Sequence, residues 1–179
     1  RRIPERGYEG FDELKDLIKS HDVKFANLEQ TFHDQEGYPS ASSGGTWAMA
    51  EPELLDEVAK FGFNLYNVAN NHTGDYGQGG VLATMQHLKE RKMIYAGIGR
   101  NLHEASRPCY LETPQARVAM IGVTTSFDPA AAAGGQSVEM HGRPGLNPLN
   151  HKAIYHLTPE TFKAAQKLPQ STLINWPIE

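Results

Sequence analysis

Short apolar runs alternate with amphipathic stretches along the chain. Apolar residues recur at helical spacing over residues 11–18, 54–61 and 81–88, which predicts three helices. Compact apolar runs over residues 23–28 and 63–69 predict two buried strands. Because strands alternate with helices, the pattern predicts a layered α/β fold.

The second half of the chain carries shorter signals. Asn101, with Glu104 three residues later, resembles a capping box that opens a short helix. Thr158, followed by proline and glutamate, predicts the start of a last helix that runs to about Leu168. The remaining strands are expected over residues 93–96, 109–111 and 118–123, the last two as a hairpin.

Polar, glycine-rich segments separate these elements. We expect long loops over residues 33–50 and 129–148, and a shorter loop over 70–80. Loops of that length in a compact domain are often functional. The length of 179 residues suits one domain, so we assign residues 1–179 to a single domain.

Composition narrows the function classes. Apolar residues make up 39% of the chain, enough for a packed core, and the net charge of −4 argues against a general nucleic-acid binder. No apolar run approaches the roughly 18 residues of a membrane span, so membrane attachment would use a segment outside this sequence. The single cysteine, Cys109, lies in an apolar stretch and is interpreted as a small packing residue.

Polar side chains follow both predicted strands of the first half. Asn27 and Glu29 come at the end of the first strand, and Asn70, Asn71 and His72 follow the second. If the two strands are parallel, both clusters emerge at one edge of the sheet, where α/β proteins bind ligands.

These residue types suit a hard or borderline divalent metal ion. Glu29 and Asn71 offer oxygen donors, and His72 could bind the ion or protonate a leaving oxygen. The Asn-Asn-His run before glycine is also good turn chemistry, because asparagine tolerates the left-handed backbone region. Spacing alone leaves both interpretations open.

A set of ordered motifs resembles a known family. The runs Ala26-Asn-Leu-Glu29, Gly62-Phe-Asn and Ala69-Asn-Asn-His-Thr-Gly-Asp75 are similar to the core of the CapA-type capsule-biosynthesis family. That family is a branch of the calcineurin-like metallophosphoesterase superfamily. Residues 142–148 resemble a further family segment, and the similarity covers residues 20–150.

The resemblance implies a fold and a site. It implies a β-sandwich flanked by helices, with two divalent metal ions such as Mn, Fe or Zn at its edge. Glu29 and Asn71 would be metal ligands, and His72 the catalytic histidine. Asn27 and Asn70 are further candidates as ligands or supports.

Other parts of the sequence depart from the family pattern. The family's opening Gly-Asp pair is absent, and His141, His151 and His156 do not match the contexts of its downstream histidines. We therefore expect a metallophosphatase-like domain that is incomplete at both ends. Asp75 is expected to hold its loop through backbone amides or to orient His72.

The resemblance also implies a biological role. It indicates a protein of capsule or poly-γ-glutamate biosynthesis in the extracytoplasmic cell envelope, acting as a metal-dependent hydrolase. The alternatives are a non-catalytic subunit of the polymer synthesis and export machinery, or a metal-free ligand-binding module. Expected partners are other capsule-synthesis subunits and a polyanionic polymer or phosphate ester, with no nucleic acid and no organic cofactor.

Overall fold

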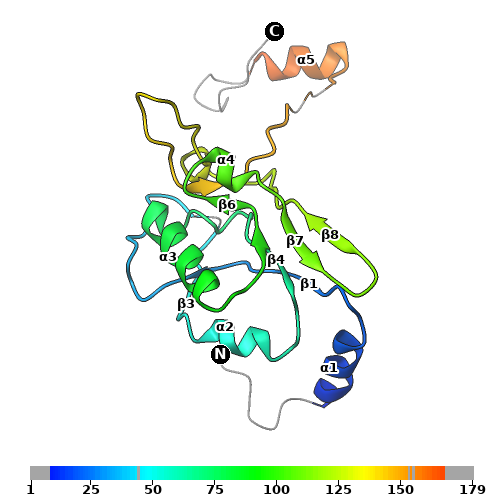
Figure 1. Ribbon diagram of the computed structural model, residues 1–179. Helices are drawn as coiled ribbons and strands as arrows, with labels where there is room; N and C mark the ends of the chain where they lie inside the picture. Colours follow the sequence, from blue (N-terminus) through cyan, green and yellow to red (C-terminus); the bar gives the residue numbers. More distant parts are fainter. Residues whose placement is uncertain (1–8, 44, 153, 155, 168–179) are drawn as a thin grey trace.

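A three-stranded parallel sheet lies at the centre of the molecule (Figure 1). A computed structural model describes residues 9–43, 45–152, 154 and 156–167. The sheet has the order β1 (Phe25–Asn27), β4 (Leu65–Asn67), β5 (Tyr95–Ala96). Both pairs of neighbours are parallel, as the helix-strand alternation predicts.

The connection from β1 to β4 contains a second small sheet and a helix. β2 (Thr31–Phe32) pairs in parallel with β3 (Met49–Ala50), and α2 (Leu54–Ala59) follows. The expected loop over 33–50 therefore ends in a strand. The two-residue length of β3 explains why no alternating pattern revealed it.

Helix α3 (Gly77–Glu90) starts four residues earlier than its apolar stripe indicates. Its first turn is rich in glycine because the loop after β2 lies directly against it. A Cβ atom on Gly79 would lie 2.9 Å from the Cα atom of Gly37, and one on Gly37 would lie 2.4 Å from the amide nitrogen of Gly80. Glycine at these positions therefore allows helix and loop backbone to touch.

The segment expected as a loop over 129–148 holds two short elements. These are a 3-10 helix η1 (Pro129–Ala131) and strand β9 (Gly145–Leu146), which pairs antiparallel with β6 (Ile98–Gly99). The loop prediction is wrong at these positions and right between them. Elements of two or three residues are fixed by their partners rather than by local periodicity.

The hairpin and the capped helix agree with the sequence pattern. β7 (Cys109–Glu112) pairs antiparallel with β8 (Arg117–Met120). At the start of α4 (Leu102–Ala105), the Asn101 side chain accepts a hydrogen bond of 2.9 Å from the Glu104 amide. Burial raises the pKa of the Cys109 thiol, which suits packing better than nucleophilic chemistry.

The hydrophobic core lies between the central sheet, α2 and α3. Leu55 of α2, Leu88 of α3 and Leu146 of β9 are fully buried in it. The stripes predicted for α2 and α3 thus supply core residues. The other buried members come from α3 and from β2, β3, β4 and β6 and the residues next to the strands: Leu28, Phe32, Ala50, Tyr66, Val68, Val81, Met85 and Ile98.

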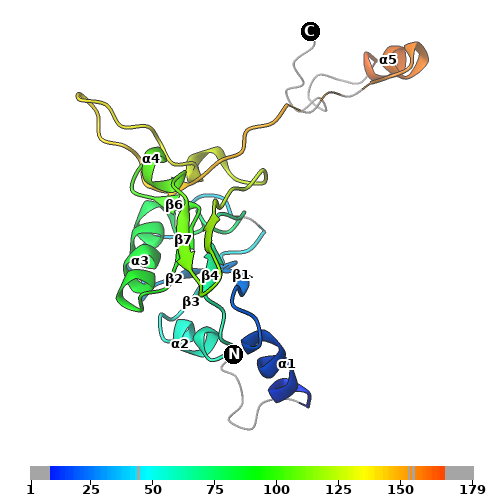
Figure 2. The ribbon, with the colours of Figure 1, turned by 45° about the vertical axis from the view of Figure 1, so that its right-hand side comes forward.

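The first and last helices lie outside this core. α1 (Phe11–Lys19) forms at the predicted position, and its Leu14 and Leu17 are exposed. α5 (Pro159–Ala165) is capped by Thr158, as predicted, and stands apart from the sheets in both views (Figures 1 and 2). The predicted end of that helix at Leu168 lies outside the described residues. In the described part of the chain, no helix is long and apolar enough to cross a membrane.

Candidate functional site

The two polar clusters meet at one edge of the central sheet. β1 and β4 pair in parallel, with Asn27 opposite Asn67. Beyond the strand ends, the Asn70 side-chain amide donates a 2.7 Å hydrogen bond to the Leu28 carbonyl. The segments after β1 and β4 are therefore joined directly, as the parallel arrangement predicts.

Asn70 holds the turn that presents His72. It is buried, and its side-chain oxygen accepts a 2.9 Å hydrogen bond from the His72 amide. The backbone amide of Asn70 donates a 3.0 Å hydrogen bond to the Thr73 hydroxyl, and that hydroxyl donates a 2.6 Å hydrogen bond to the Val68 carbonyl. These bonds occupy both ends of the Asn70 side chain, so the structure places it as a support of the loop.

His72 and Asp75 form a close pair. The Nδ1 atom of His72 lies 2.7 Å from the Oδ2 atom of Asp75, and the Asp75 side chain is 1% exposed. The same carboxylate oxygen accepts a 2.7 Å hydrogen bond from the Ala48 amide. Because a carboxylate accepts at Nδ1, that nitrogen carries the proton and Nε2 is left for other chemistry.

Asp75 also joins the long loop before β3 to the site. Its backbone carbonyl accepts a 2.8 Å hydrogen bond from the Ser40 amide, in addition to the Ala48 bond at its side chain. The loop over 33–50 is thus anchored at two points around one buried aspartate. Asp75 thus has the contacts that its two expected roles require, one with a backbone amide of this loop and one with His72.

A row of amide and carboxylate groups continues from β4 to β1. The Asn67 amide donates to the Asn27 side-chain oxygen at 2.8 Å, and the Asn27 amide donates to the Glu29 carboxylate. Asn67 is a polar residue of this edge that was not among the predicted site residues. The signal for it is the position of an asparagine in an apolar strand, opposite another asparagine once the strands are paired in parallel.

The β5–β6 turn packs against the base of this site. Gly97 has a left-handed backbone with φ of +102°, and a Cβ atom there would lie 2.9 Å from the Ala69 amide nitrogen. Only glycine permits this approach without strain. The turn therefore fixes the segment that leads from β4 to His72.

The donor set suits a divalent metal ion in part. Glu29, Asn27 and Asn71 carry oxygen donors, His72 carries an imidazole, and this chemistry fits Mn²⁺, Fe²⁺ or Zn²⁺. Glu29 is exposed at the edge, and Asn71 is half-buried in the turn. Among the described residues, no group of three or more His, Cys, Asp or Glu side chains is arranged to hold an ion. The residue types therefore suit a divalent ion, whereas the described carboxylates, histidines and cysteine form no complete ligand set.

Comparisons with known proteins agree with the motifs. Residues 4–168 match the family model described as bacterial capsule synthesis protein PGA_cap. The chain is 33% identical over 171 residues to each of two uncharacterized proteins of Sinorhizobium fredii, y4sH and y4uA. These alignments cover 94% of this chain and 37% of each relative.

A third relative has a functional name. The chain is 30% identical over 140 residues to the capsule biosynthesis protein CapA of Bacillus anthracis, covering 77% of this chain and 33% of that protein. This chain therefore belongs to the CapA-type (PGA_cap) family of bacterial capsule synthesis proteins. It spans about a third of the length of the curated relatives it matches.

Proposed function

We propose that this chain carries the catalytic edge of a metal-dependent phosphoesterase-like hydrolase that acts in capsule biosynthesis. The observation that carries the proposal is the His72–Asp75 pair at the carboxyl edge of the parallel sheet, the edge that also carries the row of Asn67, Asn27 and Glu29. A turn does not require a buried carboxylate in contact with a histidine, so the His72–Asp75 pair supports a catalytic role for His72.

The proposed role of each residue follows from its donor atoms. Glu29 and Asn71 would hold a divalent ion through oxygen, with Asn27 as a further ligand or as a support of Glu29. A bound ion would lower the pKa of a coordinated water and so supply a nucleophile at neutral pH.

His72 would donate a proton from Nε2 to the leaving oxygen of a phosphate ester. Asp75 lies against Nδ1 at 2.7 Å, so it fixes the ring and stabilises the imidazolium that donates this proton. Asn70 keeps the His72 backbone in place through the 2.9 Å bond to its amide. A proton donor and its positioning groups are therefore all within one turn of the chain.

Several wider features belong to the same proposal. The complete domain would be a β-sandwich flanked by helices, with this chain supplying the described strands and further ligands coming from the rest of the protein. The protein would act in the extracytoplasmic cell envelope on a polyanionic polymer such as poly-γ-glutamate or on a phosphate ester, together with other capsule-synthesis subunits. The CapA relative, named for capsule biosynthesis, supports this setting.

The test is turnover by the metal-loaded full-length protein. The protein is stripped with a chelator, reloaded with Mn²⁺, Fe²⁺ or Zn²⁺, and assayed on phosphomonoesters, phosphodiesters and γ-glutamyl peptides. We expect hydrolysis of a phosphate ester that disappears with the chelator and returns with metal. Undetectable turnover on all three substrate classes would reject the hydrolase and leave a non-catalytic subunit or a binding module.

A further inference from the structure

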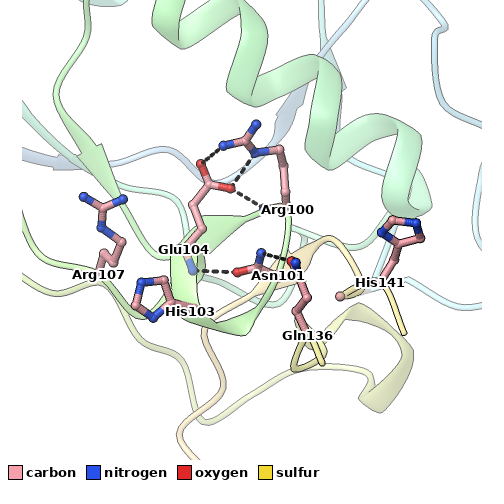
Figure 3. A pocket seen from close by; sticks show the side chains of 8 residues that line it. Arg100, Asn101, His103, Glu104, Arg107, Gln136 and His141 are labelled. Atoms are coloured by element: carbon pink, nitrogen blue, oxygen red, sulfur yellow. Dashed lines mark hydrogen bonds and ion pairs between the residues drawn. The ribbon is translucent and has the colours of Figure 1, made fainter. Parts of the chain in front are cut away.

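A polar hollow, separate from the His72 site, lies between α4 and the loop that follows η1 (Figure 3). Its volume is about 380 Å³. Every residue that lines it is polar, charged or glycine: Arg100, Asn101, His103, Glu104, Arg107, Gln136, His141 and Gly142. Such a lining favours a charged ligand over an apolar one.

The charges in this hollow are unlike those of the whole chain. Two arginines and two histidines face a single carboxylate, Glu104, whereas the chain as a whole has a net charge of −4. The hollow therefore carries a net positive charge even with both histidines neutral. Concave sites of one sign concentrate ligands of the opposite sign.

The two arginines differ in their ion pairs. Arg100 is bound by Glu104, with Nε 2.8 Å from Oε2 and Nη2 3.2 Å from Oε1. This pairing lowers the pKa of the Glu104 carboxyl, and Arg107 contributes more weakly to the same effect. No ion pair of Arg107 is found among the residues that the structure describes. The guanidinium of Arg107 is therefore the cation that a ligand would meet.

The walls of the hollow are tied together. Asn101 caps α4 with its side-chain oxygen, and its amide donates a 3.0 Å hydrogen bond to Gln136 on the opposite loop. The Leu102 amide donates to the Gly134 carbonyl at 2.9 Å. A Cβ atom on Gly142 would lie 2.3 Å from the Asn101 Cβ, so the loop lies directly against the helix cap. The hollow is thus formed before any ligand binds.

We propose that this hollow binds carboxylate groups of an anionic polymer, with Arg107 as the main contact. Arginine presents a planar fork of donors that matches a carboxylate, and Arg100 already holds one, Glu104, in that way. Because Glu104 remains in the wall, the net positive charge is small. A singly charged carboxylate suits that balance better than a doubly charged phosphate.

The topology relates this hollow to the sheet edge. β5 is parallel to β4, so the chain leaves β5 at the edge that carries His72 and reaches Arg100 through β6. A polymer bound at Arg107 would therefore lie on the side of the fold where the proposed chemistry occurs. Binding itself needs neither metal nor turnover, so this inference goes beyond the proposed function and can be tested without it.

The experiment measures binding of a fluorescent polyglutamate of defined length by anisotropy, with chelator present. It uses the full-length protein and its Arg107→Glu and Lys89→Glu variants. Both substitutions change the net charge equally, but Lys89 is exposed at the far end of α3 and does not line the hollow. We expect saturable binding that Arg107→Glu weakens about tenfold or more, since charge-assisted contacts contribute at least that much, and that Lys89→Glu changes less than about twofold.

A second variant and a second ligand complete the test. His141→Glu, on the opposite wall, should also weaken binding, and thermal unfolding verifies that each variant is folded. Equal losses for Arg107→Glu and Lys89→Glu would overturn the site in favour of diffuse electrostatics. Tighter binding of polyphosphate than of polyglutamate at matched charge would overturn the carboxylate assignment, and so would the absence of saturable binding.

Discussion

The His72 imidazole lies 2.7 Å from the Asp75 carboxylate, which is buried and also accepts a hydrogen bond from the Ala48 amide. One aspartate therefore positions a histidine and anchors the loop before β3. In the proposed mechanism these two roles are linked. The loop shields Asp75 from water, and a carboxylate shielded from water interacts more strongly with the imidazolium.

Replacing Asp75 separates these tasks. In Asp75→Asn, the side chain still accepts from the Ala48 amide but loses the charge beside His72. We expect kcat of the metal-loaded full-length protein to fall about 10- to 100-fold, with KM little changed, as for other groups that orient a catalytic side chain. Steady-state kinetics on a phosphodiester measure this.

The matched control for that variant is Asp128→Asn. Asp128 accepts hydrogen bonds from Ser42 of the same long loop and from the Ala130 amide, but it does not contact His72. The Asp128→Asn variant should keep kcat within about threefold of wild type, since loop anchoring alone does not orient the histidine. Equal losses of kcat in the two variants would show that Asp75 acts only through the loop.

Metal binding provides an independent test of the sheet edge. Glu29→Gln combined with Asn71→Ala removes a carboxylate and an amide donor from the proposed ligand set. Calorimetry with Mn²⁺ on the full-length protein should show affinity reduced by about 100-fold or more, because each lost ligand group weakens a divalent site substantially. Glu53→Gln, at an exposed position before α2, is the control. Unchanged affinity in the double variant would place the ligands elsewhere.

Much of this arrangement could be predicted from the sequence. The apolar runs over residues 23–28 and 63–69 predicted two strands, and the polar clusters that follow them predicted a shared edge on the condition that the strands are parallel. The sequence could not show which donors point at one another. The row from Asn67 to Glu29 depends on strand register, and the Ala48–Asp75 bond joins residues 27 positions apart through an aperiodic loop. Strand β3 and the Arg107 hollow were missed for the same reason, since both are formed by packing between distant segments.

The buried histidine after β2 makes stability depend on pH. His33 is fully buried against the Tyr76 ring, its Nδ1 accepts a 3.1 Å hydrogen bond from the Gln35 amide, and Glu36 lies 3.9 Å away. Its Nε2 has no hydrogen-bond partner among the described residues. Burial lowers the pKa of His33, and the neighbouring carboxylates, chiefly Glu36, oppose that shift.

The sign of the pH dependence follows from that shift. Below the ordinary histidine pKa of 6.5, the unfolded chain takes up a proton at His33 that the folded chain does not. Stability should therefore fall by up to about 1.4 kcal/mol per pH unit below that value, until the lower folded pKa is reached. Urea unfolding at pH 7.5 and 5.5 measures this loss, and His33→Gln should reduce it. His151→Gln, at an exposed position, should not. An identical loss in wild type and His33→Gln would assign the effect to other groups.

Core packing predicts a contrast between two leucines. Leu55 on α2 is completely buried, whereas Leu82 on α3 is 40% exposed. Leu55→Ala should lower the free energy of unfolding by about 2–5 kcal/mol, because it leaves a cavity beneath the sheet. Leu82→Ala should change it by only about 0.5 kcal/mol. Chemical denaturation of both variants distinguishes them, and equal midpoints would mean that α2 does not pack as described.

The role of His72 as a proton donor is tested by the rate of phosphodiester hydrolysis by metal-loaded full-length His72→Ala protein, compared with wild type and with His21→Ala. His21 lies at an exposed position after α1, away from the sheet edge. We expect His72→Ala to lower kcat by about 10²- to 10⁴-fold, as for loss of a general acid, with folding intact and His21→Ala unaffected. A His72→Ala protein that hydrolyses the substrate at the wild-type rate would contradict this role.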